Sequence, residues 1–396
     1  MSQILLDLRG LNYPFLTGVN TVTLHILKEL CHNFELLNKH DFTIFGLNSI
    51  KTERLMQEFT WLKNLLTSPD INLDHDLTHY RLKQALFLTK FYLNQPHLAW
   101  GKFDVIYQTQ PKPIPKLSKH QKLITSFHDL SSVKNFNQPR LKHFLQENAL
   151  TYQTLANRAS KIIACSYATA YDIASTLKVP DSKIKVIYLA LPEWGKLYNR
   201  SEVTKLTSLK NSRSEPEYFL ALSAFEYRKN YHNLVLAWHI MNQTEPSIYQ
   251  NYRLIIAGNK VDPKYFEYLE NLIKRLELTN ISLVCDIDSK TKNQLLANCT
   301  ALVYTSLYEG FGFPILEAQK FGKAILTGNV SSMPEIAGQG ALLVSPLDPN
   351  QICEGMAILA KDQKYRQVLE QNGVENLKRF NWKEYSLALN QIFTNN

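Results

Sequence analysis

The sequence predicts an α/β protein made of two doubly wound domains, each with a parallel sheet covered by helices on both faces. Short apolar segments alternate with amphipathic helical segments along most of the chain. The apolar segments are continuous β-branched and leucine-rich runs, which are typical of parallel strands buried on both sides. A polar segment rich in Ser and Lys interrupts this pattern near the middle, and we interpret it as the boundary between the domains.

The strands expected from these runs fall into two sets of six. The first set covers residues 3–9, 41–47, 103–109, 122–128, 161–166 and 183–189. The second covers residues 217–223, 252–258, 281–287, 301–306, 323–328 and 341–345. Helical periodicity follows the first strand over residues 21–30 and returns near the end of the chain over residues 382–393.

We therefore predict an N-terminal Rossmann-like domain, a linker, a C-terminal Rossmann-like domain and a final helical segment. Their expected bounds are residues 1–195, 196–214, 215–375 and 376–396. A chain of 396 residues that is 45% hydrophobic can bury a core in each domain. Ligands in such sheets bind at the carboxyl ends of the strands, so the cleft between the two domains is the expected active site.

The composition argues against several classes of protein. The five cysteines are scattered and include no CxxC pair, which is typical of reduced core residues in a cytosolic protein and not of a structural zinc site. The N-terminal residues contain no basic stretch followed by an apolar one, so we expect no secretory signal. No apolar run approaches the roughly 18–20 residues of a membrane span.

The formal net charge of +9 lies entirely in the first half of the chain, where residues 1–200 hold 24 basic and 15 acidic side chains. Two interpretations remain open. The excess could attract an anionic partner, such as a membrane surface or a phosphorylated acceptor. It could also be a solvated basic face that aids solubility. Because the basic residues are dispersed and no nucleic-acid motif is present, we expect no nucleic-acid partner.

The segment YEGFGFPILEA, residues 308–318, follows an expected strand and leads into an expected helix. Its loop consists of Gly310, Phe311, Gly312 and Phe313, and Pro314 suits the first helical turn, where its missing N–H costs nothing. Such a loop can present backbone N–H groups to a phosphate.

Two carboxylates flank this loop. Glu309 precedes it, and Glu317 is expected within the first helical turn, so the two would approach a common ligand from different directions. The alternative is an ordinary helix with a favourable acid near its N-terminus. That alternative accounts for Glu317 and leaves the GFGFP arrangement unexplained.

Two further loops suit an anionic ligand. Arg228 and Lys229 lie between an expected strand and a helix starting near Asn230, where the pair suits a diphosphate, although exposed basic pairs are common. Gly18 lies in the loop that leads into the first expected helix, where backbone N–H groups could face a phosphate or sugar; an ordinary helix-entry turn is the alternative. The absence of GxGxxG at this position argues against a dinucleotide-binding dehydrogenase.

Histidines occur in two contexts. His128 ends an expected strand, where it could bond a substrate hydroxyl or polarise a reacting group, or simply be satisfied by backbone. A second cluster has metal-ligand spacing but no HExxH pattern, and Asn72 beside it is typical of a turn or cap, so we favour a solvated surface helix. This cluster comprises Asp74, His75, Asp76 and His79.

Taken in order, these motifs resemble the retaining nucleotide-sugar glycosyltransferases of family 4, which have the two-domain GT-B fold. The resemblance is strongest over residues 306–348, with two Glu separated by seven residues and then an SxxPE segment. ALSAFEYRKN, SFHDL and ACSYATAYDI resemble the family's phosphate-binding loop, its active-site His-Asp element and the segment after the next strand.

The resemblance implies a role for each candidate residue. Glu309 would bond a hydroxyl of the donor sugar, and Glu317 would bond the ribose of the nucleotide. Lys229, helped by Arg228, would neutralise the diphosphate. The backbone of residues 310–314 and of Gly18 would line the diphosphate and sugar. His128 would bond the donor sugar and face the acceptor. The final helix would cross back onto the N-terminal domain.

One position departs from the family pattern. Ala224 stands where many members carry an Arg, which leaves Arg228 and Lys229 with more of the charge to carry. Related members with an Arg-Lys-Asn sequence in this loop often lack that Arg too.

The resemblance implies a retaining transferase that moves a hexose-type sugar, such as mannose or glucose, from a nucleotide diphosphate sugar to a glycan or lipid-linked acceptor in cell-surface polysaccharide synthesis. It implies no metal and no cofactor. We expect a cytoplasmic protein that is either free in the cytosol or peripheral on the inner face of the membrane, where the basic N-terminal domain would make the contact. Residues 82–100 offer either a docking face or a buried helix. The alternatives are a sugar-phosphate synthase or phosphorylase on the same fold and a non-catalytic glycan-binding subunit.

Overall fold

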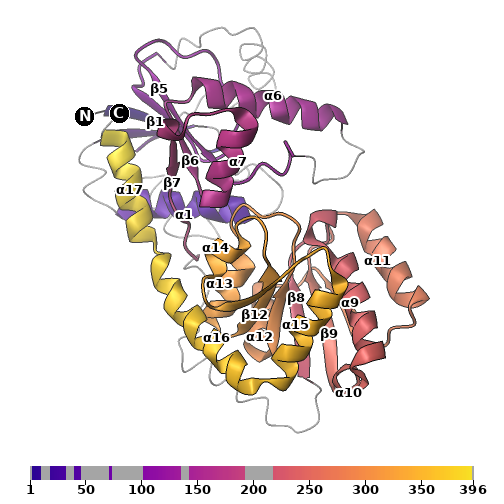
Figure 1. Ribbon diagram of the computed structural model, residues 1–396. Helices are drawn as coiled ribbons and strands as arrows, with labels where there is room; N and C mark the ends of the chain where they lie inside the picture. The colour runs from indigo at the N-terminus through magenta and orange to yellow at the C-terminus, as the bar shows by residue number, and fades with distance from the viewer. Residues whose placement is uncertain are drawn as a thin grey trace. The chain divides into compact units, whose positions relative to one another are not determined.

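The computed structural model describes residues 2–9, 18–32, 40–45, 71–73, 101–134, 142–191 and 217–394. The chain divides into two compact units, each of which is drawn with its own sheet and helices in Figure 1. Unit 1 comprises Met1–Val133, Lys142–Pro192 and Asn381–Asn396, and unit 2 comprises Lys134–Leu141 and Glu193–Phe380. The expected linker, the stretch 82–100 and the Asp74–His79 cluster lie outside the described residues.

Unit 1 is built on a parallel sheet that has seven strands within the described residues, in the order β3-β2-β1-β4-β5-β6-β7. Six of these strands match the expected ones, and β3 is additional. Asn72 lies within β3, so the expectation of a turn or cap at this residue is wrong. The strands are β1 (Ser2–Asp7), β2 (His40–Phe45), β3 (Ile71–Leu73), β4 (Val105–Gln108), β5 (Lys122–Phe127), β6 (Lys161–Ala164) and β7 (Ile184–Val186).

The helices of unit 1 include one from the far end of the chain. They are α1 (Gly18–His32), α6 (Lys142–Arg158), α7 (Tyr167–Leu177), the short 3₁₀ helix η5 (Asp181–Lys183) and α17 (Trp382–Thr394). Helix α17 lies against α1 (Figure 1), where Trp382 stacks on His25 with ring centroids 4.7 Å apart. The Tyr385 hydroxyl lies 3.2 Å from the Tyr107 hydroxyl on β4. The expected return of the last helix to the N-terminal domain is therefore confirmed.

Unit 2 is built on a six-stranded parallel sheet, counted over the described residues, in the order β10-β9-β8-β11-β12-β13. All six strands lie within the expected segments. They are β8 (Glu217–Leu222), β9 (Tyr252–Gly258), β10 (Ile281–Cys285), β11 (Ala301–Tyr304), β12 (Ala324–Gly328) and β13 (Ala341–Val344).

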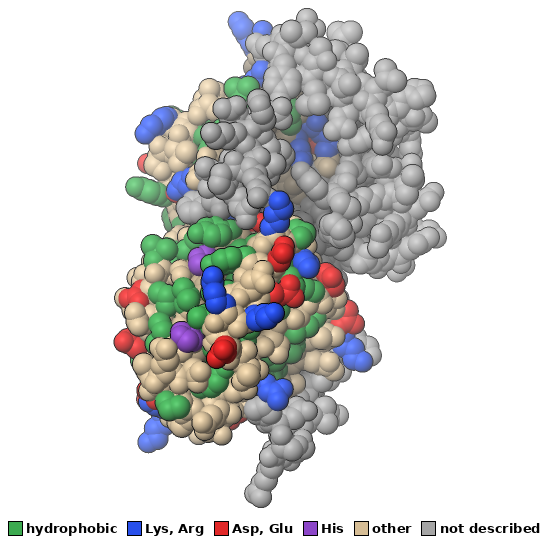
Figure 2. All heavy atoms as spheres, turned by 90° about the vertical axis from the view of Figure 1, so that its right-hand side faces the viewer, with side chains coloured by type: hydrophobic (Ala, Val, Ile, Leu, Met, Phe, Trp, Pro, Cys, Tyr) green, Lys and Arg blue, Asp and Glu red, His purple; other side chains and the backbone are tan. Residues whose placement is uncertain are grey.

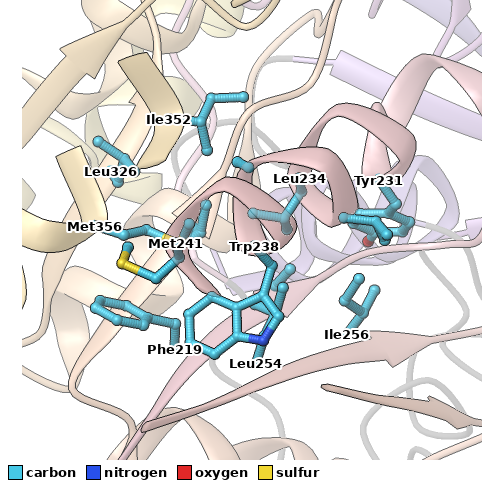
Figure 3. Packing of buried hydrophobic residues seen from close by; sticks show 14 of the residues in the cluster. Phe219, Tyr231, Leu234, Trp238, Met241, Leu254, Ile256, Leu326, Ile352 and Met356 are labelled. Atoms are coloured by element: carbon cyan, nitrogen blue, oxygen red, sulfur yellow. The ribbon is translucent and has the colours of Figure 1, made fainter. Parts of the chain in front are cut away.

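Helices pack against the sheet of unit 2 and bury its hydrophobic core. Figure 3 shows this core around Trp238, which is fully buried among residues such as Phe219 and Met241. The helical segments are η7 (Tyr227–Lys229), α9 (Tyr231–Thr244), α10 (Pro246–Asn251), α11 (Pro263–Arg275), α12 (Ser289–Asn298), α13 (Phe313–Lys320), α14 (Met333–Ala337), α15 (Pro349–Lys361), α16 (Gln363–Asn376) and η8 (Leu377–Arg379).

The strand order of each sheet reverses at one point, and this point predicts where ligands bind. In unit 2 the chain moves outward from β8 on one side and from β11 on the other, so the loops after these neighbouring strands leave the carboxyl edge side by side. The corresponding pair in unit 1 is β1 and β4. Crevices at such switch points are the usual binding sites of open parallel sheets.

Charged side chains of both signs are interspersed on the face of unit 2 shown in Figure 2. This mixture agrees with the balance of charge after residue 200. The whole chain has 44 basic and 35 acidic side chains, and 24 and 15 of them precede that point, so 20 of each sign follow it. Over the described residues, every helix is too short or too polar to cross a membrane.

Candidate functional site

The loop after β8 carries Arg228 and Lys229 in η7 and is fixed by Asn230. Asn230 adopts a left-handed conformation with φ of 64°, which Asn tolerates better than most residues. Its fully buried side-chain amide donates hydrogen bonds to the carbonyl oxygens of Thr305, at 3.0 Å, and Pro346, at 2.6 Å. Asn230 therefore ties the loop after β8 to the loops after β11 and β13.

The glycine loop after β11 leads directly into α13. Gly312 caps the helix with φ of 110°, a conformation that strains any residue with a Cβ, and Pro314 lies in the first turn as expected. The Ser331 hydroxyl donates to the Glu309 carbonyl. The Ser332 hydroxyl lies 2.9 Å from the same carbonyl and 2.8 Å from that of Phe311. These two serines, from the SxxPE segment, hold the loop in place.

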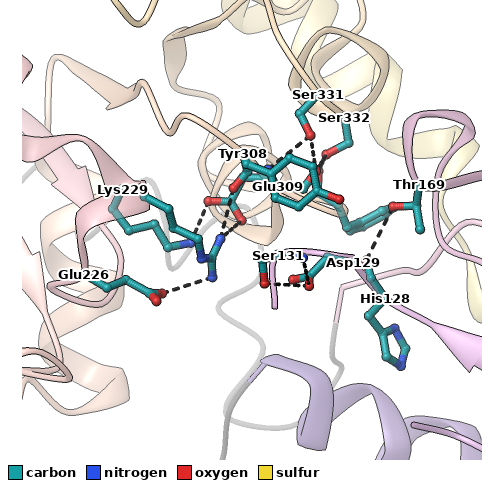
Figure 4. Close-up of polar contacts among 12 residues, drawn as sticks. His128, Asp129, Ser131, Thr169, Glu226, Lys229, Tyr308, Glu309, Ser331 and Ser332 are labelled. Atoms are coloured by element: carbon teal, nitrogen blue, oxygen red, sulfur yellow. Dashed lines mark hydrogen bonds and ion pairs between the residues drawn. The ribbon is translucent and has the colours of Figure 1, made fainter. Parts of the chain in front are cut away.

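The two loops meet in a buried ion cluster, shown in Figure 4. The Oε1 atom of Glu309 accepts a hydrogen bond from Lys229 Nζ at 2.6 Å, and its Oε2 atom accepts one from the Arg228 guanidinium at 2.9 Å. Arg228 also pairs with Glu226 at 3.0 Å. The side chains of Lys229 and Glu309 are only 6% and 8% exposed, so this is an interior pair.

The charges in this cluster are strongly coupled. Burial acts to raise the pKa of Glu309, but Lys229 and Arg228 outweigh it and hold the pKa at about 2. Burial and the neighbouring Arg228 lower the pKa of Lys229, and Glu309 partly opposes them. Lys229 Nζ also lies 5.7 Å from the ring centroid of Tyr304, a cation–π contact. The cluster is thus a place in unit 2 where two cations are partly desolvated.

Glu317 lies on α13 and has a different partner. Its Oε1 atom accepts a hydrogen bond from Lys292 Nζ of α12 at 2.7 Å. The helix begins at Phe313 and has no acid in its first turn, so the expectation that Glu317 lies within that turn is wrong. Because Phe313 and Pro314 are already helical, the first turn ends one residue before Glu317. The structure therefore groups Glu309 with Lys229 and Arg228 and places Glu317 farther along the helix.

In unit 1, His128 lies just after β5, and its Nε2 atom is 2.8 Å from the Thr109 carbonyl oxygen. A carbonyl can only accept, so the neutral ring carries its hydrogen on Nε2, which makes Nδ1 the acceptor nitrogen. Burial lowers the pKa of His128, although Thr109 and Asp129 oppose this effect. Burial of His128 therefore favours the neutral imidazole, whose Nδ1 could accept a hydrogen bond from a hydroxyl.

The switch point of unit 1 carries a polar network that the sequence did not reveal. Buried Asp7, at the end of β1, pairs with Arg9 at 2.6 Å and accepts a hydrogen bond from Gln108 of β4 at 2.9 Å. Burial acts to raise the pKa of Asp7, but Arg9 outweighs it, and the pKa is lowered. Gly18 is the first residue of α1, as expected for a helix entry.

The chemistry available at these sites is hydrogen bonding and charge neutralisation. Within the described ranges, no three His, Cys, Asp or Glu side chains lie close enough together to hold a metal ion. Two cations in one loop, a helix N-terminus beside them and a carboxylate between them suit a ligand that combines a diphosphate with hydroxyl groups.

Comparison with solved structures defines the class of fold. Anabaena Alr3699/HepE in complex with UDP-glucose superposes with a TM-score of 0.67 at 20% identity, over 100% of this chain and 99% of that one. WaaG, a glycosyltransferase involved in lipopolysaccharide biosynthesis, superposes with a TM-score of 0.64 at 13% identity, over 100% of both chains. The protein therefore has the two-domain GT-B fold.

Two family profiles identify the family. Residues 16–191 match Glycosyltransferase Family 4, and residues 204–376 match Glycosyl transferases group 1. Together the two profiles cover most of the chain, and the chain therefore belongs to the glycosyltransferases of family 4, as the resemblance of its motifs implied.

Curated relatives include O-antigen enzymes. The O-antigen chain mannosyltransferase B of Escherichia coli is 24% identical over 390 residues, which is 96% of each chain. The serotype-specific mannosyltransferase WbdA of Escherichia coli is 27% identical over 277 residues, 68% of this chain. That match spans only about a third of WbdA, which is a longer protein.

Proposed function

We propose that the protein is a retaining glycosyltransferase that moves a hexose-type sugar from a nucleoside diphosphate sugar to a glycan or lipid-linked acceptor in cell-surface polysaccharide synthesis. The observation that carries this proposal is the ion cluster of Lys229, Arg228 and Glu309 at the switch point of unit 2. Mannose is the first sugar to test, because several relatives are named mannosyltransferases.

The cluster is suited to a leaving group that gains negative charge. When the bond between the anomeric carbon and the diphosphate breaks, Lys229 and Arg228 would stabilise the departing phosphate oxygens, helped by the positive end of α13. The new bond forms between the anomeric carbon and an acceptor hydroxyl, whose proton passes to a phosphate oxygen. The configuration at the anomeric carbon is retained if the acceptor attacks from the face that the phosphate leaves.

The hydroxyl groups of the donor would be bound by the two acids and by His128. Glu309 would accept from the sugar and Glu317 from the ribose, while His128 would accept a sugar hydroxyl through Nδ1. The backbone of residues 310–314 and Gly18 would line the diphosphate and sugar. In the structure Glu309 already bonds both cations, so a bound diphosphate would have to take over one or both of these contacts.

The first experiment is a thermal-shift screen with UDP-, GDP-, ADP- and dTDP-linked hexoses, because a ligand of the native state raises stability by mass action. Transfer is then assayed with the best donor. We expect Lys229→Ala to lose at least about 2–3 kcal/mol of transition-state stabilisation, the usual scale for one preorganised contact. If Lys229→Ala and Glu309→Ala both leave transfer unchanged in a working assay, the site assignment is wrong.

The same assays address the alternatives. A sugar-phosphate synthase would use a sugar phosphate as its acceptor, a phosphorylase would respond to free phosphate, and a glycan-binding subunit would show no turnover. We also propose that transfer needs no metal, since the two cations that bond Glu309 would neutralise the diphosphate. The basic N-terminal half would favour docking to the anionic inner face of a membrane.

A further inference from the structure

Lys292 and Glu317 form an ion pair between two neighbouring helices of unit 2. Lys292 Nζ donates to Glu317 Oε1 at 2.7 Å, and α12 contacts α13. The backbone of α12 is anchored close to the pair. The Asp288 side chain caps α12 by accepting from the Thr291 N–H at 2.7 Å, and the Lys292 N–H donates to the Asp288 carbonyl.

This pair is more enclosed than the surface ion pairs of the same unit. The side chains of Lys292 and Glu317 are 33% and 22% exposed. The corresponding values are 58% and 31% for Lys361 with Glu245. Pairs as exposed as the latter add little to stability, and they do not hold a side chain in one place. The partly enclosed pair can fix the direction of the Glu317 carboxylate.

The geometry leaves part of this carboxylate for a ligand. An ionised carboxylate has about four acceptor positions on its two oxygens, and Lys292 uses one of them on Oε1. Glu317 lies five residues after the capping Gly312, about 7 Å farther along the helix axis. A ligand whose diphosphate lies at the N-terminus of α13 would therefore place the next group, a pentose with two adjacent hydroxyls, beside Glu317.

We propose that Lys292 is the positioning residue that holds the Glu317 carboxylate in the direction in which it accepts from both ribose hydroxyls, so that Lys292 sets the preference for ribonucleotides. The proposal rests on the proposed function, because it assumes that Glu317 faces the ribose. Lys292 acts through Glu317 and need not touch the reacting atoms. Removal of Lys292 should therefore weaken binding of the ground state and of the transition state alike, which raises KM and leaves kcat nearly unchanged.

The test compares matched nucleotides on matched variants. Lys292→Met removes the charge and keeps most of the apolar stem, and Lys292→Arg keeps a charged donor. Lys290→Met serves as the control, because Lys290 is an exposed residue two positions earlier on the same helix. Each purified full-length variant is titrated calorimetrically with UDP and GDP and with their 2′,3′-dideoxy analogues. Thermal unfolding without ligand confirms that each variant is folded.

We expect wild type to bind the ribonucleotide roughly ten- to a hundredfold more tightly than the dideoxy analogue, the scale of hydrogen bonds to a charged group. For Lys292→Met, the affinity for the ribonucleotide should fall most of the way to that for the dideoxy analogue, and the affinity for the dideoxy analogue should stay as in wild type. Lys292→Arg should retain the ratio in large part, and Lys290→Met should match wild type. With the nucleotide sugar as substrate, Lys292→Met should raise KM without lowering kcat.

Three results would overturn the proposal. If Lys292→Met keeps the wild-type ratio, Lys292 does not position Glu317. If wild type shows no preference for the ribonucleotide, Glu317 does not read the ribose, although the glycosyltransferase function can still stand on the transfer assay. If neither UDP nor GDP nor any of the nucleotide sugars binds, the proposed function fails together with this inference.

Discussion

The substitution Glu309→Gln separates two roles of the buried ion cluster. Gln keeps the shape and one acceptor oxygen but removes the charge that pairs with both Lys229 and Arg228. If these cations bind the diphosphate, Glu309 competes with the ligand for them in the wild-type protein. We therefore expect Glu309→Gln to bind a free nucleoside diphosphate more tightly than wild type, and to transfer sugar more slowly because a sugar ligand is lost.

The magnitude follows from the electrostatics of the pair. Its cations lower the pKa of Glu309 from 4.5 to about 2, which is equivalent to about 3 kcal/mol at about 1.4 kcal/mol per pKa unit. This value agrees with the roughly 3–5 kcal/mol that is lost when one partner of a buried pair is removed. About 3 kcal/mol would be the largest gain in affinity, roughly a hundredfold. Arg228 keeps Glu226 as a partner, so we expect a gain nearer tenfold.

The assay is calorimetric titration of both proteins at pH 7 with UDP and GDP, together with thermal unfolding in the presence and absence of the nucleotide. The variant should be less stable alone and should gain more stability from the nucleotide than wild type gains. Glu245→Gln is the control, because it breaks a surface pair with Lys361 and should leave nucleotide affinity unchanged. If Glu309→Gln binds the nucleotide no more tightly than wild type, Glu309 does not compete with the diphosphate.

Three further outcomes follow from the same contacts. Because the pKa of Glu309 is lowered in the folded protein, its contribution to unfolding free energy is present above pH 4.5 and is lost as pH falls toward about 2; urea unfolding across this window should show a smaller acid loss in Glu309→Gln. Asn230→Ala should destabilise the protein by about 2–4 kcal/mol in chemical denaturation, since it strains a left-handed residue and removes two buried hydrogen bonds, and Asn230→Gly should cost less. Transfer measured with excess EDTA should equal transfer with added Mg²⁺ or Mn²⁺, and a loss of activity that the metal restores would contradict metal-independent transfer.

Much of the fold could be predicted because its strands are continuous apolar runs. Every strand of unit 2 and six strands of unit 1 fall where such runs occur. The strand β3 was missed because it is three residues long and has Asn72 at its centre. Its pairing with β2 forms the strand, and the local sequence does not indicate that pairing. The return of the last helix was expected from family resemblance alone, because the sequence of that segment does not indicate that it packs against Tyr107 and His25.

The site was predicted as separate motifs, and their connections could not be read from the sequence. Lys229 and Glu309 are 80 positions apart, and only the adjacency of β8 and β11 brings their loops together. Asn230 looked like an ordinary helix start, yet it reaches Pro346, which is 116 positions away. Lys292 had no distinguishing signal on α12 other than being one of several polar residues. Such partners depend on tertiary packing, which single-sequence patterns do not specify.

The most direct test of the central claim is a crystal structure of the protein with the nucleoside diphosphate sugar that the thermal-shift screen selects. We predict that the diphosphate contacts Lys229 and Arg228 at the N-terminus of α13, that Glu309 turns from these cations to a sugar hydroxyl, and that the ribose hydroxyls meet Glu317. A nucleotide sugar bound away from the switch point of unit 2, with the Lys229–Glu309 pair intact, would contradict the account.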